Sequence, residues 1–195
     1  MKKRLIGIFV CVLLIGNVLP LTTIAGDEEN PEIEDGQNDI TGPFSSFIPP
    51  VFFEDIDIIS AWFFENDDQP EYLSVSLKVS KLKSCLFPTL YTVSWAYGDV
   101  EYSTTHGILW LGVLSAATLT NGATGLSFSI YSSFDTNKNI ITFVVPKDMI
   151  GNPRQGDVLT NTGALGVQAL PIVTIIGWED KAPNDGFGSN YTIKY

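Results

Sequence analysis

Cysteine and histidine are scarce in this 195-residue chain, and their scarcity excludes several classes of protein. The two cysteines are Cys11, inside an apolar N-terminal run, and Cys85. If that run is removed, no internal disulfide can form, so a core, a metal or assembly must stabilise the fold. His106 is the single histidine, which excludes a metal centre built from several imidazoles.

Positive charge is also in short supply. The chain has 11 Lys and Arg residues against 22 Asp and Glu residues, and its net charge is −11. Nucleic acid is not expected as a partner, because its phosphates would be repelled and no basic patch is present to release counterions. The same argument disfavours anionic membrane surfaces. Divalent cations, neutral sugars and basic proteins remain as partners, although acidity also serves solubility.

Motifs for catalysis are missing as well. No G-x-S-x-G segment is present. A Ser–His–Asp triad would have to use His106, with partners that need not be close in sequence. With 22 acidic residues, the two facing carboxylates of a glycosidase cannot be singled out by counting. We therefore expect a protein without enzymatic activity, and a secreted hydrolase that depends on His106 is the less favoured alternative.

The N-terminus carries the clearest positive signal. Lys2, Lys3 and Arg4 precede an apolar run over Leu5–Leu19, and Thr23-Ile24-Ala25 is a small-residue site of the A-x-A type. This layout predicts a secretory signal peptide over residues 1–25, cleaved after Ala25. A retained anchor is the alternative, but a spanning helix needs roughly 20 apolar residues. Cleavage removes three positive charges, so the mature chain would carry a net charge of −14 and no stable membrane span.

Composition divides the remainder into two parts. Residues 26–50 are rich in Asp, Glu, Asn, Pro and Gly and contain few large apolar side chains. Such a composition is typical of disorder, because it cannot bury enough apolar surface. We expect a disordered acidic leader over residues 26–50 and a single folded domain over residues 51–195.

The folded part has the pattern of β-strands. Apolar and polar residues alternate over Tyr72–Ser80 and again over Leu126–Tyr131, as in strands with one buried face. Gly98-Asp99 and the polar run 135–139 predict hairpin turns. The one helical candidate is Pro146–Ile150. Many short strands separated by turns predict an all-β fold: an antiparallel β-sandwich of the jelly-roll type with at most one short helical turn.

Acidic clusters make calcium the expected metal, because calcium takes six to eight oxygen ligands, mostly from loops. Three clusters stand out: Glu54-Asp55 with Asp57, Glu65 with Asp67 and Asp68, and Glu179-Asp180 with Asp185. From these we expect a structural calcium held by Asp55, Asp57, Asp180 and Asp185. Each cluster can also be read as a solvated turn. Asp135, Asn137 and Asn139 have the spacing of half a calcium loop, but the glycine and the closing glutamate of that loop are missing.

Aromatic side chains are the candidates for ligand contact, since flat rings stack on sugars. Trp62 and Trp95 lie inside strand-like runs and are expected in the core. Trp178 lies at a strand-to-loop boundary, where ligand contacts are common. We therefore expect Trp178, Trp110 and Tyr97 to form the ligand-binding surface.

Two stretches together have a familiar order. The first is Asp57–Glu65, which fits "D-h-x-x-A", followed by Tyr72–Val79, which fits "Y-L-x-V-x-h-x-V". The second is Phe134–Pro146, which ends in "I-x-h-x-V-P", followed by Ile150-Gly151 and a Gly156-Asp157 loop. This order resembles secreted β-sandwich domains of the DOMON-like superfamily, including family-nine carbohydrate-binding modules.

The resemblance implies a sandwich that binds sugar with a pair of aromatic residues and often holds a structural calcium. In a haem-binding branch it implies Met and His ligands, for which the mature chain has only Met149 and His106. The sequence thus predicts a non-catalytic binding module, secreted or at the cell surface, that binds carbohydrate. The alternative is a structural or adhesion protein of the surface, which binds a cell-surface protein or a second copy of itself.

Overall fold

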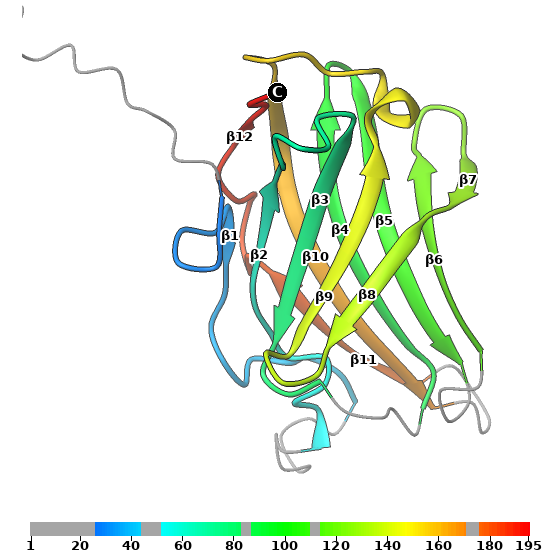
Figure 1. Ribbon diagram of the computed structural model, residues 1–195. Helices are drawn as coiled ribbons and strands as arrows, with labels where there is room; N and C mark the ends of the chain where they lie inside the picture. The colour runs from blue at the N-terminus through cyan, green and yellow to red at the C-terminus, as the bar shows by residue number, and fades with distance from the viewer. Residues whose placement is uncertain (1–25, 44–51, 83–86, 110–113, 171–175) are drawn as a thin grey trace, which may run out of the picture.

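The computed structural model describes residues 26–43, 52–82, 87–109, 114–170 and 176–195. They form two antiparallel sheets packed face to face, which confirms the predicted β-sandwich (Figure 1). The predicted signal peptide, residues 44–51 and Trp110 lie outside the described residues. Within the described part of the chain, no helix is long and apolar enough to cross a bilayer.

One sheet has five strands in the order β1-β2-β3-β9-β8. Its strands are β1 (Ile33–Glu34), β2 (Ile58–Phe64), β3 (Tyr72–Val79), β8 (Tyr131–Asp135) and β9 (Ile140–Pro146). The seven-stranded sheet has the order β11-β10-β4-β5-β6-β7, with β12 paired to β10. Its strands are β4 (Thr89–Tyr97), β5 (Val100–Leu109), β6 (Leu114–Asn121), β7 (Leu126–Ser129), β10 (Val158–Leu170), β11 (Ile176–Ala182) and β12 (Tyr191–Thr192).

Local turn chemistry explains the connections that the sequence predicts. Tyr97 pairs with Val100, and Gly98 between them has a φ of 60°, which a two-residue hairpin turn requires at this position. At the tip of the β8–β9 hairpin, Asp135 Oδ1 accepts hydrogen bonds from the main-chain N–H groups of residues 137 and 138. The predicted helical turn is the 3₁₀ segment η2 (Lys147–Ile150), which ends at a left-handed Gly151.

The core lies between the sheets. The apolar members of the predicted alternation on β3 are all buried there: Leu73, Val75, Leu77 and Val79. Phe63 of β2 meets Trp95 of β4 edge to face, with ring centroids 5.6 Å apart. Trp95 is buried in this core, as predicted, whereas Trp62 is buried on the opposite face of β2 from Phe63 and is not part of the core cluster.

Residues 26–43 differ from the disordered leader that composition predicts. Ile33 is fully buried in the core, and β1 pairs with β2 through Ile33 and Ala61. Thr41 then forms a bridge with Glu179 of β11, so this N-terminal segment (residues 26–43) runs from the edge of one sheet to the edge of the other. Main-chain pairing with two edge strands and the packing of Ile33 and Ile40 order the segment, and average composition reveals neither feature.

Candidate metal site and ligand groove

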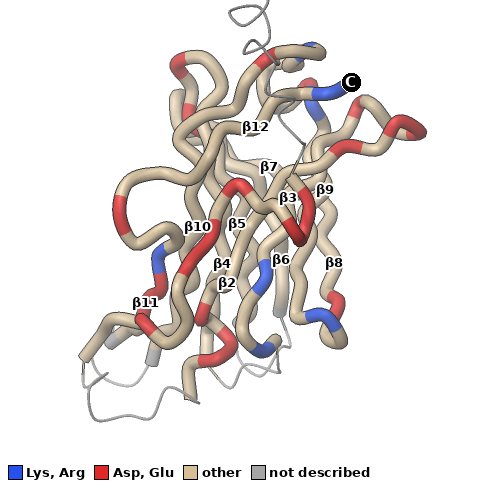
Figure 2. Tube along the Cα trace, turned by 90° about the vertical axis from the view of Figure 1, so that its left-hand side faces the viewer, with Lys and Arg blue, Asp and Glu red and all other residues tan. Residues whose placement is uncertain are grey.

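The edge of the sandwich closed by the N-terminal segment is strongly acidic. Figure 2 shows this side, with Asp and Glu segments in red beside the labels of β11 and β2. Asp180 of β11 faces the opposite sheet and is only 2% exposed. The main-chain N–H of Ile58, the first residue of β2, donates to Asp180 Oδ2 at 2.6 Å.

Two carboxylates of the N-terminal segment join Asp180. Carboxylate oxygens of Asp35, Asp39 and Asp180, which we call the Asp cluster, lie within 4.8 Å of one another. Each side chain has one buried oxygen that finds no hydrogen-bond partner among the described residues: Asp35 Oδ2, Asp39 Oδ1 and Asp180 Oδ1. Buried charges are normally paired or bound to a metal, so this arrangement is short of a cation.

The electrostatics of the cluster agree with that shortage. Burial raises the pKa of Asp180 to about 7, and the negative charges of Asp39, Asp35 and Asp57 add to the rise, against the N–H of Ile58. Burial also raises the pKa of Asp35, helped by Asp39 and Asp57. Among the described residues, no ion pair includes Asp35, Asp39 or Asp180. A bound cation would reverse the balance and favour the charged carboxylates.

Neighbouring side chains hold the cluster in place. The Asn184 amide donates to Asp35 Oδ1 at 3.0 Å and to Asp39 Oδ2 at 2.5 Å. Asp57 accepts a hydrogen bond from the main-chain N–H of Asn38 at 2.8 Å. A donor set made only of carboxylate oxygens suits a hard divalent cation such as calcium rather than zinc or copper.

The predicted metal ligands separate in the structure. Asp180 belongs to the Asp cluster, and Asp57 lies close enough to raise its pKa. Asp55 instead accepts a hydrogen bond from Gln168 Nε2 at 2.8 Å, and Asp185 is exposed on the loop after β11. Asp35 and Asp39 are not among the predicted ligands, because both lie in the segment whose composition predicts a disordered leader.

The predicted aromatic surface does not form around Trp178. Its ring is buried and packs on Phe53, with centroids 4.9 Å apart, while its Nε1 donates to the carbonyl of Pro43 at 3.1 Å. Alternation along β11 places Trp178 on the same inward face as Asp180, so no ring face is open to a sugar. Tyr97 is half-buried, and its hydroxyl donates to Asp157 Oδ2 at 2.7 Å.

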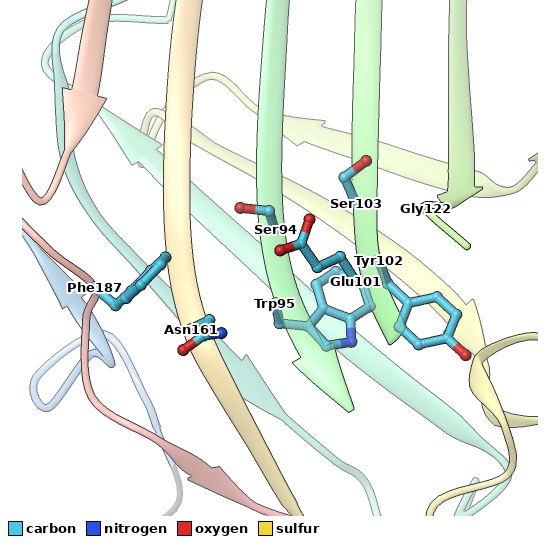
Figure 3. Close-up of a pocket in the computed structure, with 8 residues that line it drawn as sticks. All are labelled: Ser94, Trp95, Glu101, Tyr102, Ser103, Gly122, Asn161 and Phe187. Atoms are coloured by element: carbon cyan, nitrogen blue, oxygen red, sulfur yellow. The ribbon is translucent and has the colours of Figure 1, made fainter. Parts of the chain in front are cut away.

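A groove that could hold a ligand lies on the outer face of the seven-stranded sheet. This is the face that points away from the core. One hollow of about 330 Å³ is lined by Ser94, Glu101, Asn161 and Phe187, among others (Figure 3). A second hollow of about 480 Å³ shares Ser94 and Phe187 with it. Together they form the outer groove. The Phe187 ring is 66% exposed.

The backbone beneath the outer groove is irregular. The pairing of β10 with β4 shifts between Thr160 and Gly163, as in a β-bulge. Asn161, inside the shift, has a φ of 53°, which non-glycine residues seldom adopt. Bulges and such backbone conformations gather at functional sites, because they re-aim side chains.

His106 lies on β5, away from the outer groove, and its buried side chain packs against β8. Its Nδ1 is 2.8 Å from Ser132 Oγ, and its ring meets Phe134 edge to face. Its Nε2 is buried without a partner, and burial lowers the pKa of the imidazole. A triad needs one ring nitrogen on a serine and the other on a carboxylate, and no carboxylate of the described residues makes the second contact.

No protein-family model matches this chain, and no curated protein or solved structure is significantly similar to it. The two-sheet sandwich agrees with the fold that the DOMON-like resemblance implies. Proteins with unrelated functions share such sandwiches, so the fold alone does not indicate a function. The Asp cluster and the outer groove are the features from which a function can be inferred.

Proposed function

We propose that this chain is a non-catalytic extracellular binding module whose sandwich is completed by a calcium ion. The observation that carries the proposal is the Asp cluster, three carboxylates within 4.8 Å of one another, each with a buried unpartnered oxygen. Three negative charges at this spacing repel one another in a poorly solvated site. A calcium ion among them turns that repulsion into attraction and supplies the missing partners.

The position of the cluster gives the ion a structural role. Asp35 and Asp39 belong to the N-terminal segment, whereas Asp180 belongs to an edge strand of the seven-stranded sheet. Bound calcium would fasten the segment across the edge between the two sheets. A ligand that binds only this closed arrangement raises the free energy of unfolding by mass action.

Carbohydrate is the ligand class that suits the outer groove. An exposed Phe187 ring can stack on the apolar face of a sugar, and Glu101, Ser94 and Asn161 offer groups that hydrogen-bond sugar hydroxyls. This assignment moves the sugar site from Trp178 to the outer groove. It agrees with the sugar binding and structural calcium that the DOMON-like and family-nine resemblance implies, and with export directed by residues 1–25.

A calcium titration of the melting temperature tests the proposal. We expect the melting temperature to rise with calcium and to fall back on addition of a chelator. The Asp39→Asn variant should lose most of the response, while Asp185→Asn, an exposed carboxylate outside the cluster, should keep it. A melting temperature that ignores calcium in the unmodified protein would refute the calcium site.

A second candidate, a surface protein that assembles with itself, is favoured by one specific observation. β7 and β8 end their respective sheets, and four large apolar side chains near them are exposed: Leu126, Phe128, Tyr131 and Phe134. Free strand edges with exposed apolar side chains promote pairing between chains. Sedimentation at increasing protein concentration tests this candidate. A dimer that is lost in the Phe128→Ser variant would support self-assembly, and a monomer at every concentration would refute it.

A further inference from the structure

Glu32, just before β1, is another buried carboxylate, and it has no cationic partner in the part of the chain that the structure describes. Glu32 is only 7% exposed. Its Oε2 accepts a hydrogen bond from the main-chain N–H of Phe63 at 2.9 Å. Phe63 lies beyond the last pairing of β2 with β1, so the carboxylate replaces a missing main-chain partner. Among the described residues, ion pairs join Lys78 to Glu28, Lys81 to Glu54 and Lys147 to Glu65, and none includes Glu32.

The surroundings of Glu32 leave it short of positive charge. Burial raises its pKa to about 7, although the main-chain N–H groups of Phe63, Glu32 and Gly26 act in the opposite direction. The nearby Asp27 raises the pKa further. A charged carboxylate in such a place is costly unless a cation lies beside it.

Gly26 lies directly against the carboxylate of Glu32. Gly26 is buried, and its main-chain N–H is one of the donors to the Glu32 carboxylate. A Cβ atom built on Gly26 would overlap both carboxylate oxygens, so no residue with a side chain fits without displacing Glu32. The main-chain nitrogen of Gly26 therefore lies against the buried carboxylate of Glu32, which forms no ion pair with any described residue.

Cleavage of the signal peptide would turn this nitrogen into a free amine. Gly26 directly follows Ala25, the residue after which the signal peptide is expected to be cleaved. Hydrolysis of the Ala25–Gly26 bond by a signal peptidase consumes one water, leaves a carboxylate on Ala25 and frees an amine on Gly26. That amine takes up a proton at neutral pH, because an α-amino group has a pKa of about 7.7–8.0.

We propose that removal of the signal peptide creates an ion pair between the α-ammonium of Gly26 and the buried carboxylate of Glu32, which locks the N-terminal segment onto the sandwich. The precursor has only a neutral amide at this place. The processing step thus supplies the charge that Glu32 lacks. This lock is separate from the calcium and sugar sites of the proposed function.

The test compares two chains that differ by one residue, 26–195 and 25–195, both in saturating calcium. All residues of the core cluster lie between Ile33 and Ile193, so both chains contain the whole described core. We expect the melting temperature of the shorter chain to be higher by about 5 °C or more, because breaking a buried ion pair is strongly destabilising. The difference should vanish with Glu32→Gln and persist with Glu34→Gln, an exposed neighbour. Equal melting temperatures, or a difference that survives Glu32→Gln, would overturn the proposal.

A direct measurement covers the case in which Glu32→Gln does not fold. The α-amine of Gly26 in the 26–195 chain can be titrated by NMR after ¹⁵N labelling. We expect its pKa to lie above the ordinary value of about 8, since a buried carboxylate favours the charged amine. An ordinary or lowered pKa would contradict the ion pair. So would a secreted protein whose mass places its first residue anywhere but Gly26.

Discussion

The main-chain N–H of Ile58 donates a 2.6 Å hydrogen bond to Oδ2 of Asp180 and so connects β2 with β11 across the edge of the sandwich. The other oxygen of Asp180 is buried and has no hydrogen-bond partner within the described ranges. The fold therefore fixes one carboxylate of the Asp cluster through its own backbone, and the N-terminal segment brings the other two.

Replacing Asp180 by Asn should change stability in opposite directions with and without calcium. In chelator, Asp180→Asn removes a buried negative charge but keeps an oxygen for Ile58, so we expect the free energy of unfolding to rise by about 1–2 kcal/mol. In saturating calcium the variant should be less stable than the unmodified protein, since it lacks a charged ligand. Urea denaturation in both media measures this. A variant that is destabilised in chelator would contradict the cation-deficient cluster.

Calcium affinity should fall as the solution is acidified. The folded pKa of Asp180, raised by burial to about 7, lies above the ordinary aspartate value of 3.8. Without calcium, its contribution to stability is therefore full below pH 3.8 and is lost as the pH rises through about 7. Calcium needs the charged form, so protons compete with it. Titration calorimetry should give a dissociation constant about tenfold larger at pH 6 than at pH 8. An affinity independent of pH would exclude Asp180 as a ligand.

Local patterns made the strands and hairpins predictable. The alternation over Tyr72–Ser80 predicts which side chains of β3 face the core, because adjacent residues of a strand point to opposite faces. Gly98 and the polar run 135–139 predict the two hairpins, because each turn depends only on residues beside it. The sandwich thus follows from short-range rules.

The Asp cluster depends on a long-range contact that these rules do not reach. Thr41 and Glu179, which pair at this edge, are 138 residues apart in the chain. Ile33 and Ile40 are the only large apolar residues of the N-terminal segment, and they are its sole sign of order in the sequence. The burial of Trp178 is unpredictable for the same reason, because its indole N–H bonds the carbonyl of Pro43 at the end of the N-terminal segment.

The buried ion pair of Lys147 and Glu65 should matter far more than the exposed pair of Lys78 and Glu28. Both side chains of the first pair are almost fully buried, and Glu65 also accepts hydrogen bonds from Tyr191 at 3.0 Å and from the N–H of residue 194. Lys147→Met leaves Glu65 charged and unpaired, so we expect a loss of about 3–5 kcal/mol.

The matched control is Lys78→Met, whose pair is about one-third exposed and should cost less than about 1 kcal/mol. Adding Glu65→Gln to Lys147→Met should restore part of the lost stability, because the buried negative charge is then gone. Urea denaturation of the four proteins measures these differences. Equal losses of unfolding free energy in Lys147→Met and Lys78→Met would mean that burial does not determine how much these ion pairs stabilise the protein.

Phe187 and Trp178 should respond in different assays. Phe187 is exposed at the outer groove, so Phe187→Ala should leave the melting temperature nearly unchanged and weaken glycan binding at least tenfold, about 1.4 kcal/mol. Trp178 packs on Phe53 out of reach of solvent, so Trp178→Ala should cost about 3–5 kcal/mol of stability. Phe52→Ala, another exposed phenylalanine, is the control for loss of an apolar surface ring. If Trp178→Ala abolished glycan binding in a protein that remains folded, while Phe187→Ala had no effect, the sugar site would lie at the β11 edge and not in the outer groove.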